Sequence, residues 1–156
     1  MTLPASDLIS LLREQKKTVA TAESCTGGLL GKLLTDVPGS SEAYVGGVIS
    51  YTCPVKESLL GVSHQDLEEY GPVSKTVARQ MAEGVRSRLG TDFGLATTGL
   101  AGPDGDGSGK PVGLVYVALA GNGWTICEEL HLSGGRSAVR TAAAERALEI
   151  LRDSLN

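Results

Sequence analysis

Residues 18–28 read T-V-A-T-A-E-S-C-T-G-G, and this stretch decides the fold. Its first five residues are apolar or β-branched and predict a buried strand. A small glycine-containing turn follows, and the amphipathic run at residues 29–34 then predicts a helix. A strand that passes through a short turn into a helix is the basic unit of an α/β protein.

Ser24 lies at the centre of that turn. A hydroxyl at a strand-to-helix junction is exposed and sits beside the amide groups of a helix N-terminus, which can hold a developing oxyanion. The alternative is that Ser24 only caps the helix. Because T-A-E-S-C-T-G-G is not the G-x-S-x-G nucleophile elbow, the turn alone leaves both interpretations open.

The rest of the chain repeats the alternation of helices and strands. Helices are predicted at residues 3–17, 25–35, 54–60, 63–69, 74–89 and 136–155, and strands at 18–22, 43–51, 93–98, 112–120 and 124–132. Gly46 and Gly47 inside a strand predict a bulge or a close backbone approach. Gly121-Asn122-Gly123 predicts a hairpin between the last two strands. We therefore expect a three-layer α/β/α sandwich with a mixed, mostly parallel sheet.

Composition limits the class of protein. The chain has 156 residues, of which 41% are hydrophobic, so we expect one domain spanning residues 1–156. With 14 Lys and Arg against 18 Asp and Glu, the net charge of −4 argues against a nucleic-acid partner. No apolar stretch approaches membrane-spanning length and no secretory signal is evident, so we expect a cytoplasmic protein without a membrane partner. Three separated cysteines indicate free thiols.

A serine nucleophile needs a nearby base, and Lys56 is the best candidate. The two histidines, His64 and His131, lie in a helix start and in the final strand, which are unpromising positions. A desolvated lysine can act as the base in Ser–Lys sites. Lys56 begins a short helix just after the strand ending at Tyr51, so we expect Tyr51 to relay or hold a proton. A solvated surface lysine is the alternative.

Two further segments suit an anionic ligand. Residues 97–103, T-T-G-L-A-G-P, expose hydroxyls and backbone amides, although a tight turn explains the glycines nearly as well. Arg136 and Arg140 lie one helical turn apart and predict a clamp for phosphate or carboxylate, or else an exposed basic face. The D-G-D-G-S-G run at residues 104–109 lacks the downstream glutamate of a calcium loop, so we expect no metal.

Six segments, in order, resemble the CinA carboxy-terminal domain family across nearly the whole chain. They are T-A-E-S-C-T-G-G (21–28), G-G-V-I-S-Y-T-C-P-V-K (46–56), G-P-V-S (71–74), T-G-L-A-G-P-D-G (98–105), K-P-V-G (110–113) and S-G-G-R (133–136). The resemblance implies a PncC-type nicotinamide-nucleotide amidohydrolase, which converts nicotinamide mononucleotide to nicotinic acid mononucleotide and ammonia without a cofactor.

The resemblance implies that Ser24 is the nucleophile, Lys56 its base and Tyr51 a partner in proton transfer. It also implies that Thr98 lines the site and that Arg136 lies near the charged part of the substrate. With the motifs above, the expected substrate-binding residues are Thr26, Gly27, Thr98, Gly99, Ala101, Gly102, Arg136 and Arg140. The expected partner is therefore a small-molecule nucleotide; a homo-oligomer is an open expectation for which no interface is indicated.

Two positions depart from the family pattern. Cys53, followed by Pro54, stands where active members usually carry asparagine, and Gly135 stands where they carry aspartate. Two rival interpretations therefore remain: a catalytically silent nucleotide-binding or regulatory paralogue, and an amidase or esterase for another small substrate. The nucleotide pyrophosphatase domain of longer CinA proteins is not expected within 156 residues.

Overall fold

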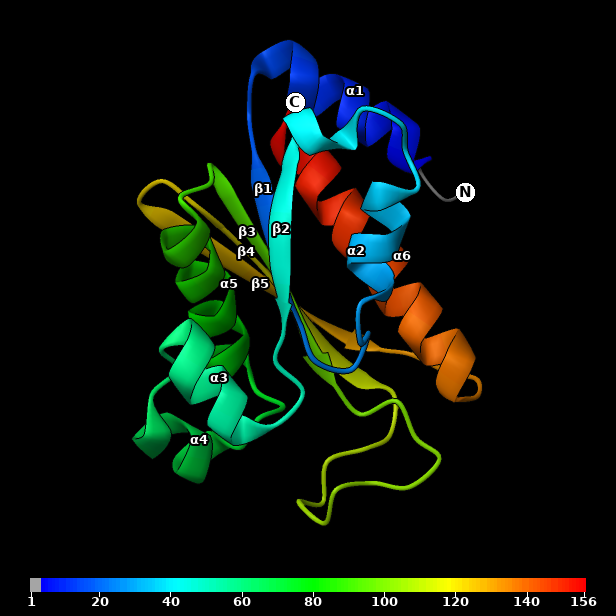
Figure 1. Ribbon diagram of the computed structural model, residues 1–156. Helices are drawn as coiled ribbons and strands as arrows, with labels where there is room; N and C mark the ends of the chain where they lie inside the picture. The colour runs from blue at the N-terminus through cyan, green and yellow to red at the C-terminus, as the bar shows by residue number, and fades with distance from the viewer. Residues whose placement is uncertain (1–3) are drawn as a thin grey trace.

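The computed structural model describes residues 4–156 and shows one sheet covered on both faces by helices (Figure 1). The strands are β1 (Val19–Glu23), β2 (Tyr44–Ile49), β3 (Phe93–Gly99), β4 (Leu114–Gly121) and β5 (Trp124–His131). The helices are α1 (Ala5–Gln15), α2 (Leu29–Thr35), α3 (Cys53–Leu60), α4 (His64–Tyr70), α5 (Lys75–Leu89) and α6 (Arg136–Ser154), with a 3-10 helix at Ser40–Glu42.

The sheet is mixed, as expected, and its strand order is β2-β1-β3-β4-β5. β1 pairs in parallel with β2 and β3, whereas β4 is antiparallel to both β3 and β5. Only β4 therefore runs against the other four strands, although half of the pairings are antiparallel because β4 lies between two of them. The term "mostly parallel" thus fits the strand directions better than the pairings.

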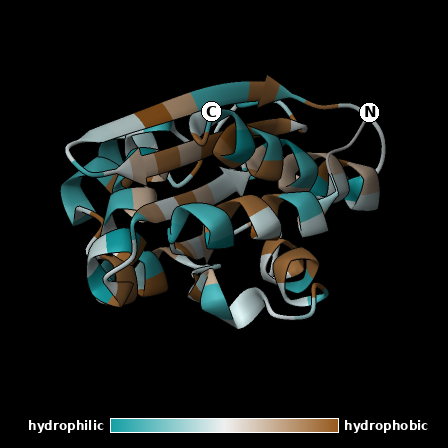
Figure 2. Cartoon of the chain, turned by 90° about the horizontal axis from the view of Figure 1, so that it is seen from above, coloured by the Kyte–Doolittle hydropathy of each residue, from teal (hydrophilic) through white to brown (hydrophobic). Residues whose placement is uncertain are grey.

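The two faces of the sheet are covered by different helices, so the α/β/α sandwich is confirmed. One core cluster joins α1, α2 and α6 to the sheet through residues such as Leu8, Leu30 and Leu151. The other joins α3, α4 and α5 through Leu60, Leu67 and Met81. Figure 2 shows hydrophobic and hydrophilic residues alternating along these helices, the pattern of amphipathic helices that cover a sheet.

The expected irregularity at Gly46 and Gly47 is confirmed. The register between β1 and β2 shifts by one residue at Val45. A Cβ on Gly47 would lie 2.3 Å from Thr21 Oγ1, so the strands approach too closely there for a side chain.

Element boundaries differ from expectation mainly at α2, which begins at Leu29 and not at Cys25. Gly27 and Gly28 have φ angles of 57° and 103°, which interrupt the helical path and leave the serine turn outside the helix. The first helix begins at Ala5; Leu3, which the expected helix included, lies outside the described residues. The 3-10 helix was not predicted.

Candidate active site

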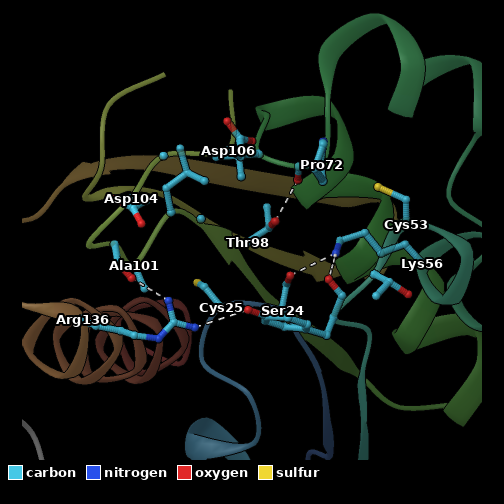
Figure 3. Close-up of a pocket in the computed structure, with 17 residues that line it drawn as sticks. Ser24, Cys25, Cys53, Lys56, Pro72, Thr98, Ala101, Asp104, Asp106 and Arg136 are labelled. Carbon is cyan, nitrogen blue, oxygen red and sulfur yellow. Dashed lines mark hydrogen bonds between the residues drawn. The ribbon is translucent and has the colours of Figure 1, made fainter. Parts of the chain in front are cut away.

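A cavity of about 320 Å³ opens where β1, β2 and β3 end. Ser24 follows β1, Tyr51 and Lys56 follow β2, and Thr98 lies at the end of β3, just before the loop that begins at Leu100. Because parallel strands end at the same edge of a sheet, three distant segments meet there, as expected. Figure 3 shows Ser24, Lys56 and Thr98 around one hollow, with Arg136 of α6 at its rim.

Lys56 and Ser24 are in direct contact inside this cavity. The Lys56 Nζ donates a hydrogen bond to Ser24 Oγ at 3.0 Å and another to the Ser50 carbonyl at 2.7 Å (Figure 3). Lys56 is only 1% exposed, so it is not a solvated surface lysine. The geometry is that of a base held against a hydroxyl.

Burial lowers the pKa of Lys56 below its ordinary value of 10.5, because the ammonium form loses hydration. The nearby thiols of Cys53 and Cys25 act in the opposite direction and are smaller effects. Within residues 4–156 no carboxylate forms a hydrogen bond or an ion pair with Lys56, whose partners are Ser24, Ser50 and the Tyr51 carbonyl. A neutral amine, which can accept a proton, is therefore favoured near neutral pH more than in an exposed lysine.

The helix-capping interpretation of Ser24 is wrong. The N-cap of α2 is Gly28, and the amides of Gly28, Leu30 and Gly31 donate to the carboxylate of Glu23 at 3.2, 2.9 and 3.0 Å. Glu23 is only 3% exposed and takes the place that Ser24 was expected to take. These helix amides are thus occupied, so the α2 N-terminus is not the free oxyanion site that the sequence suggested.

Thr26 and Gly27 do not line the cavity, contrary to their assignment as substrate-binding residues. Thr26 is fully buried, and its hydroxyl donates to Glu23 at 2.6 Å and contacts the Thr97 hydroxyl at 2.8 Å. Gly27 turns the chain with a positive φ, and its amide donates to the Ser24 carbonyl at 3.1 Å. Both residues shape the turn from behind.

Arg140 also lies behind the cavity wall. Its Nε donates to the Cys25 carbonyl at 3.0 Å and its Nη2 to the Thr26 carbonyl at 3.1 Å. The expected clamp of Arg136 and Arg140 on one ligand is therefore not formed. One helical turn along α6 carries Arg140 past the cavity and over the serine turn.

The remaining assigned residues do line the cavity: Thr98, Gly99, Ala101, Gly102 and Arg136. Thr98 is 1% exposed and donates to the Pro72 carbonyl at 2.8 Å, which ties β3 to the segment before α5. Arg136 donates to the Gly102 carbonyl at 2.7 Å and holds the glycine-rich loop against α6. The loop contributes Asp104 and Asp106 as well, which sequence reasoning had considered only as metal ligands.

Tyr51 reaches the site differently from expectation. Its side chain is 59% exposed, and its hydroxyl accepts a hydrogen bond from Arg136 Nη2 at 3.3 Å. Lys56 contacts only the main-chain carbonyl of Tyr51, at 3.3 Å. The proton-relay role of the phenol stays a prediction.

His64 and His131 lie on the surface, paired with Glu57 and Glu129 respectively, and neither lines the cavity. In the part of the chain that the structure describes, no group of three or more His, Cys, Asp or Glu side chains is arranged to hold a metal. None of the described helices is long and apolar enough to cross a membrane.

The sequence model of the CinA C-terminal domain matches residues 2–155. The chain belongs to this family. A CinA-like protein of Syntrophomonas wolfei is 48% identical over 150 residues, which are 96% of this chain and 36% of that protein. A putative competence-damage inducible protein of Thermoanaerobacter pseudethanolicus is 50% identical, over 93% of this chain and 35% of its own length. The chain thus spans about a third of these relatives.

Solved structures share the CinA fold over all or nearly all of the chain. The CinA superfamily protein of Escherichia coli has a TM-score of 0.94 at 35% identity and covers 96% of this chain and 87% of its own. The competence/damage inducible protein CihA of Agrobacterium tumefaciens has a TM-score of 0.92 at 39% identity. The match covers 100% of this chain and 99% of the Agrobacterium chain.

The two departures of this CinA domain from the family pattern lie in different places. Cys53 is the first residue of α3, one helical turn before Lys56, and it lines the cavity. Gly135 is the N-cap of α6, beside Arg136, and a Cβ added there would meet nothing within 4 Å.

Sequence reasoning missed Glu23, Ser50 and Cys25 as parts of this CinA site. A carboxylate just before a helix is a recognisable signal, because anions favour helix N-termini. The Ser50 carbonyl carries no signal, since any residue type offers it. Cys25 lines the cavity, and burial raises the pKa of its thiol to about 11, so the thiol stays neutral.

Proposed function

We propose that this CinA domain is a Ser–Lys amidohydrolase that deamidates nicotinamide mononucleotide to nicotinic acid mononucleotide and ammonia. One observation carries the proposal: the buried Lys56 Nζ lies 3.0 Å from Ser24 Oγ at the floor of a cavity. A volume of about 320 Å³ falls at the small end of the range for small-molecule sites.

The reaction follows from these two groups. Ser24 Oγ forms a bond to the carboxamide carbon while its proton passes to neutral Lys56. The C–N bond then breaks, and the nitrogen leaves as ammonia with the proton that Lys56 returns. Water attacks the acyl group, Lys56 accepts the proton from that water and passes it to Oγ, and the free acid leaves.

Arg136 is the residue proposed to lie near the substrate's phosphate. Its guanidinium borders the cavity at the glycine-rich loop, opposite the Ser24–Lys56 pair in Figure 3. Binding the ribose 5′-phosphate there would orient the amide over Ser24. In this proposal plain nicotinamide is a poor substrate, and the reaction belongs to pyridine-nucleotide salvage in the cytoplasm.

The test is incubation of the purified chain with nicotinamide mononucleotide, with ammonia and nicotinic acid mononucleotide both measured. Ser24→Ala and Lys56→Ala are expected to abolish product, whereas Ser40→Ala and Lys32→Ala, outside the cavity, are expected to keep it. Activity that survives Ser24→Ala refutes the nucleophile. If the unaltered chain binds nicotinamide mononucleotide tightly but forms no product, the result supports a catalytically silent paralogue. Cys53, which lines the cavity, is the observation that motivates this alternative.

A further inference from the structure

Arg140 holds two consecutive carbonyls of the turn that carries Ser24. Its Nε and Nη2 donate to the Cys25 and Thr26 carbonyls at 3.0 and 3.1 Å. A Cβ on Gly27 would lie 3.1 Å from Nη2, so the guanidinium lies directly against the turn. Because a guanidinium is planar, its two donors keep a fixed spacing and impose one orientation on both carbonyls.

This orientation is transmitted along the backbone. In a planar trans peptide the carbonyl and the following N–H point in opposite directions, so holding the Thr26 carbonyl also directs the Gly27 N–H. The Gly27 N–H donates to the Ser24 carbonyl at 3.1 Å. The Ser24 carbonyl shares its peptide plane with the Cys25 N–H, which is therefore directed as well.

Glu23 supports the same turn through its carboxylate. Its carboxylate accepts from the Thr26 hydroxyl and from three amides at the start of α2. Because those helix amides already bind Glu23, we consider the next amide along the chain from the nucleophile, the N–H of Cys25. Cys25 lines the cavity. In serine-nucleophile sites the N–H of the following residue commonly stabilises the oxyanion.

We propose that Arg140 is a positioning residue: it holds the Ser24 turn so that the Cys25 N–H points at the oxyanion formed on attack. The inference rests on the proposed function, since the oxyanion is that of the amide reaction. Arg140 itself does not touch the substrate. This differs from the phosphate or carboxylate clamp expected from sequence.

The test compares Arg140→Ala and Arg140→Lys with Arg146→Ala, a matched loss of a paired arginine further along α6. Steady-state kinetics are measured with nicotinamide mononucleotide and with nicotinamide riboside, which lacks the phosphate. Arg140→Ala is expected to lower kcat roughly 10- to 100-fold with little change in KM, the size expected for a small misplacement of reacting groups. Arg140→Ala is expected to lower kcat/KM by the same factor for both substrates. Arg140→Lys is expected to retain part of the lost activity.

A raised KM with unchanged kcat, or a loss confined to the phosphate-bearing substrate, overturns the proposal, because Arg140 would then bind substrate. Equal losses in Arg140→Ala and Arg146→Ala overturn it too. If Arg140→Ala does not fold, Arg140→Lys carries the same comparison. Thermal melts of all variants show which ones fold.

A second measurement separates this inference from the amidase proposal. A fluorophosphonate forms an Oγ–P bond with a reactive serine as its P–F bond breaks, and mass spectrometry detects the adduct on Ser24 without any amide substrate. Failure to hydrolyse nicotinamide mononucleotide with normal labelling refutes the amidase alone. Slower labelling of Arg140→Ala than of the unaltered chain supports the positioning role, and equal rates overturn it.

Discussion

At the scale of single residues, Lys56 combines two properties that oppose each other. Among residues 4–156 it is the largest fully buried side chain, and its hydrogen bonds to those residues go to a hydroxyl and two carbonyls. Burial favours the neutral amine, which the proposed role of Lys56 as a base requires, but the same burial makes the charged form costly to the folded state. Activity and stability should therefore respond to pH through this one group.

The first prediction concerns the pH dependence of the reaction. Because burial lowers the pKa of Lys56, the reactive neutral form appears below pH 10.5. We expect kcat/KM to rise with pH and to level off above the lowered pKa, measured on nicotinamide mononucleotide from pH 6 to 10. If Tyr51 relays the proton, Tyr51→Phe lowers kcat without moving the inflection. An inflection that disappears in Tyr51→Phe contradicts its assignment to Lys56.

The second prediction is that Lys56→Met stabilises the protein at pH 7. The folded pKa of Lys56 lies below its ordinary value of 10.5, so the unfolded chain binds this proton more tightly, and stability rises with pH toward 10.5. Removing the amine removes this cost. Each gain of about 1 kcal/mol in the free energy of unfolding raises the melting temperature by about 2–4 °C. Thermal melts at pH 7 and pH 10 should show the gain shrinking at the higher pH.

The control is Lys32→Met, at an exposed site, which should show no such trend. A Lys56→Met protein that is less stable than the unaltered chain at both pH values contradicts the prediction.

At the scale of elements, α2 depends on a carboxylate outside the helix. Glu23, the last residue of β1, accepts hydrogen bonds from two α2 amides and from the amide of the N-cap residue Gly28, which would otherwise be unpaired. It thereby joins a strand of the sheet to the helix that follows the serine turn, and the turn between them is held at both ends.

The third prediction tests this junction with Glu23→Gln. The neutral amide has one acceptor oxygen in place of two and brings donors toward amides that also donate, so we expect a loss of roughly 2–3 kcal/mol. Urea unfolding measures it. Glu42→Gln, which breaks the exposed pair with Arg13, should cost no more than about 1 kcal/mol. Equal costs for the two variants would mean that the buried cap contributes little.

The fourth prediction concerns the start of α6. Gly135 is its N-cap with extended backbone angles, φ −75° and ψ 178°, and makes no side-chain cap bond. Gly135→Asp supplies an acceptor and a negative charge at the helix N-terminus, which should add about 0.5–1 kcal/mol of stability. Gly135→Ala fits the same space but offers no acceptor, so it should not stabilise. A gain that is equal in both variants refutes capping as its cause.

At the scale of the whole molecule, charge decides which partners the surface attracts. The chain carries a net charge of −4, and several basic side chains already pair with acids, as in Arg13–Glu42, Lys32–Asp36 and Arg146–Glu128. A net negative charge disfavours the approach of polyanions such as DNA.

The fifth prediction follows from this charge. Fluorescence anisotropy with a labelled DNA duplex in 150 mM salt should detect no binding tighter than about 100 µM, the weak limit of non-specific association. A polybasic peptide of known affinity serves as the positive control. Tight binding that weakens steeply with salt would contradict the prediction and reveal a cationic surface formed by folding.

The fold class and several of the residues that meet in the cavity could be predicted from local patterns. Alternation of strand and helix signals indicated the α/β sandwich, and three segments at strand ends indicated one cavity. Ser24 and Lys56 were identifiable because each is a reactive residue type at a strand end. The roles of Thr26 and Arg140 were predicted wrongly, because each was judged by what its side chain can bind, without knowledge of the direction in which it points.

From local interactions alone, the chain specifies where strands and helices form, and the order of these elements places Ser24 and Lys56 at the same edge of the sheet. Folding in three dimensions decides what spacing along the chain cannot. The Ser24–Lys56 contact joins residues 32 positions apart, and the contacts of Arg140 with Cys25 and Thr26 cross more than 100 positions. Such contacts arise only when the sheet and α6 pack together, since burial, hydrogen-bond direction and the lowered pKa of Lys56 depend on neighbours in space.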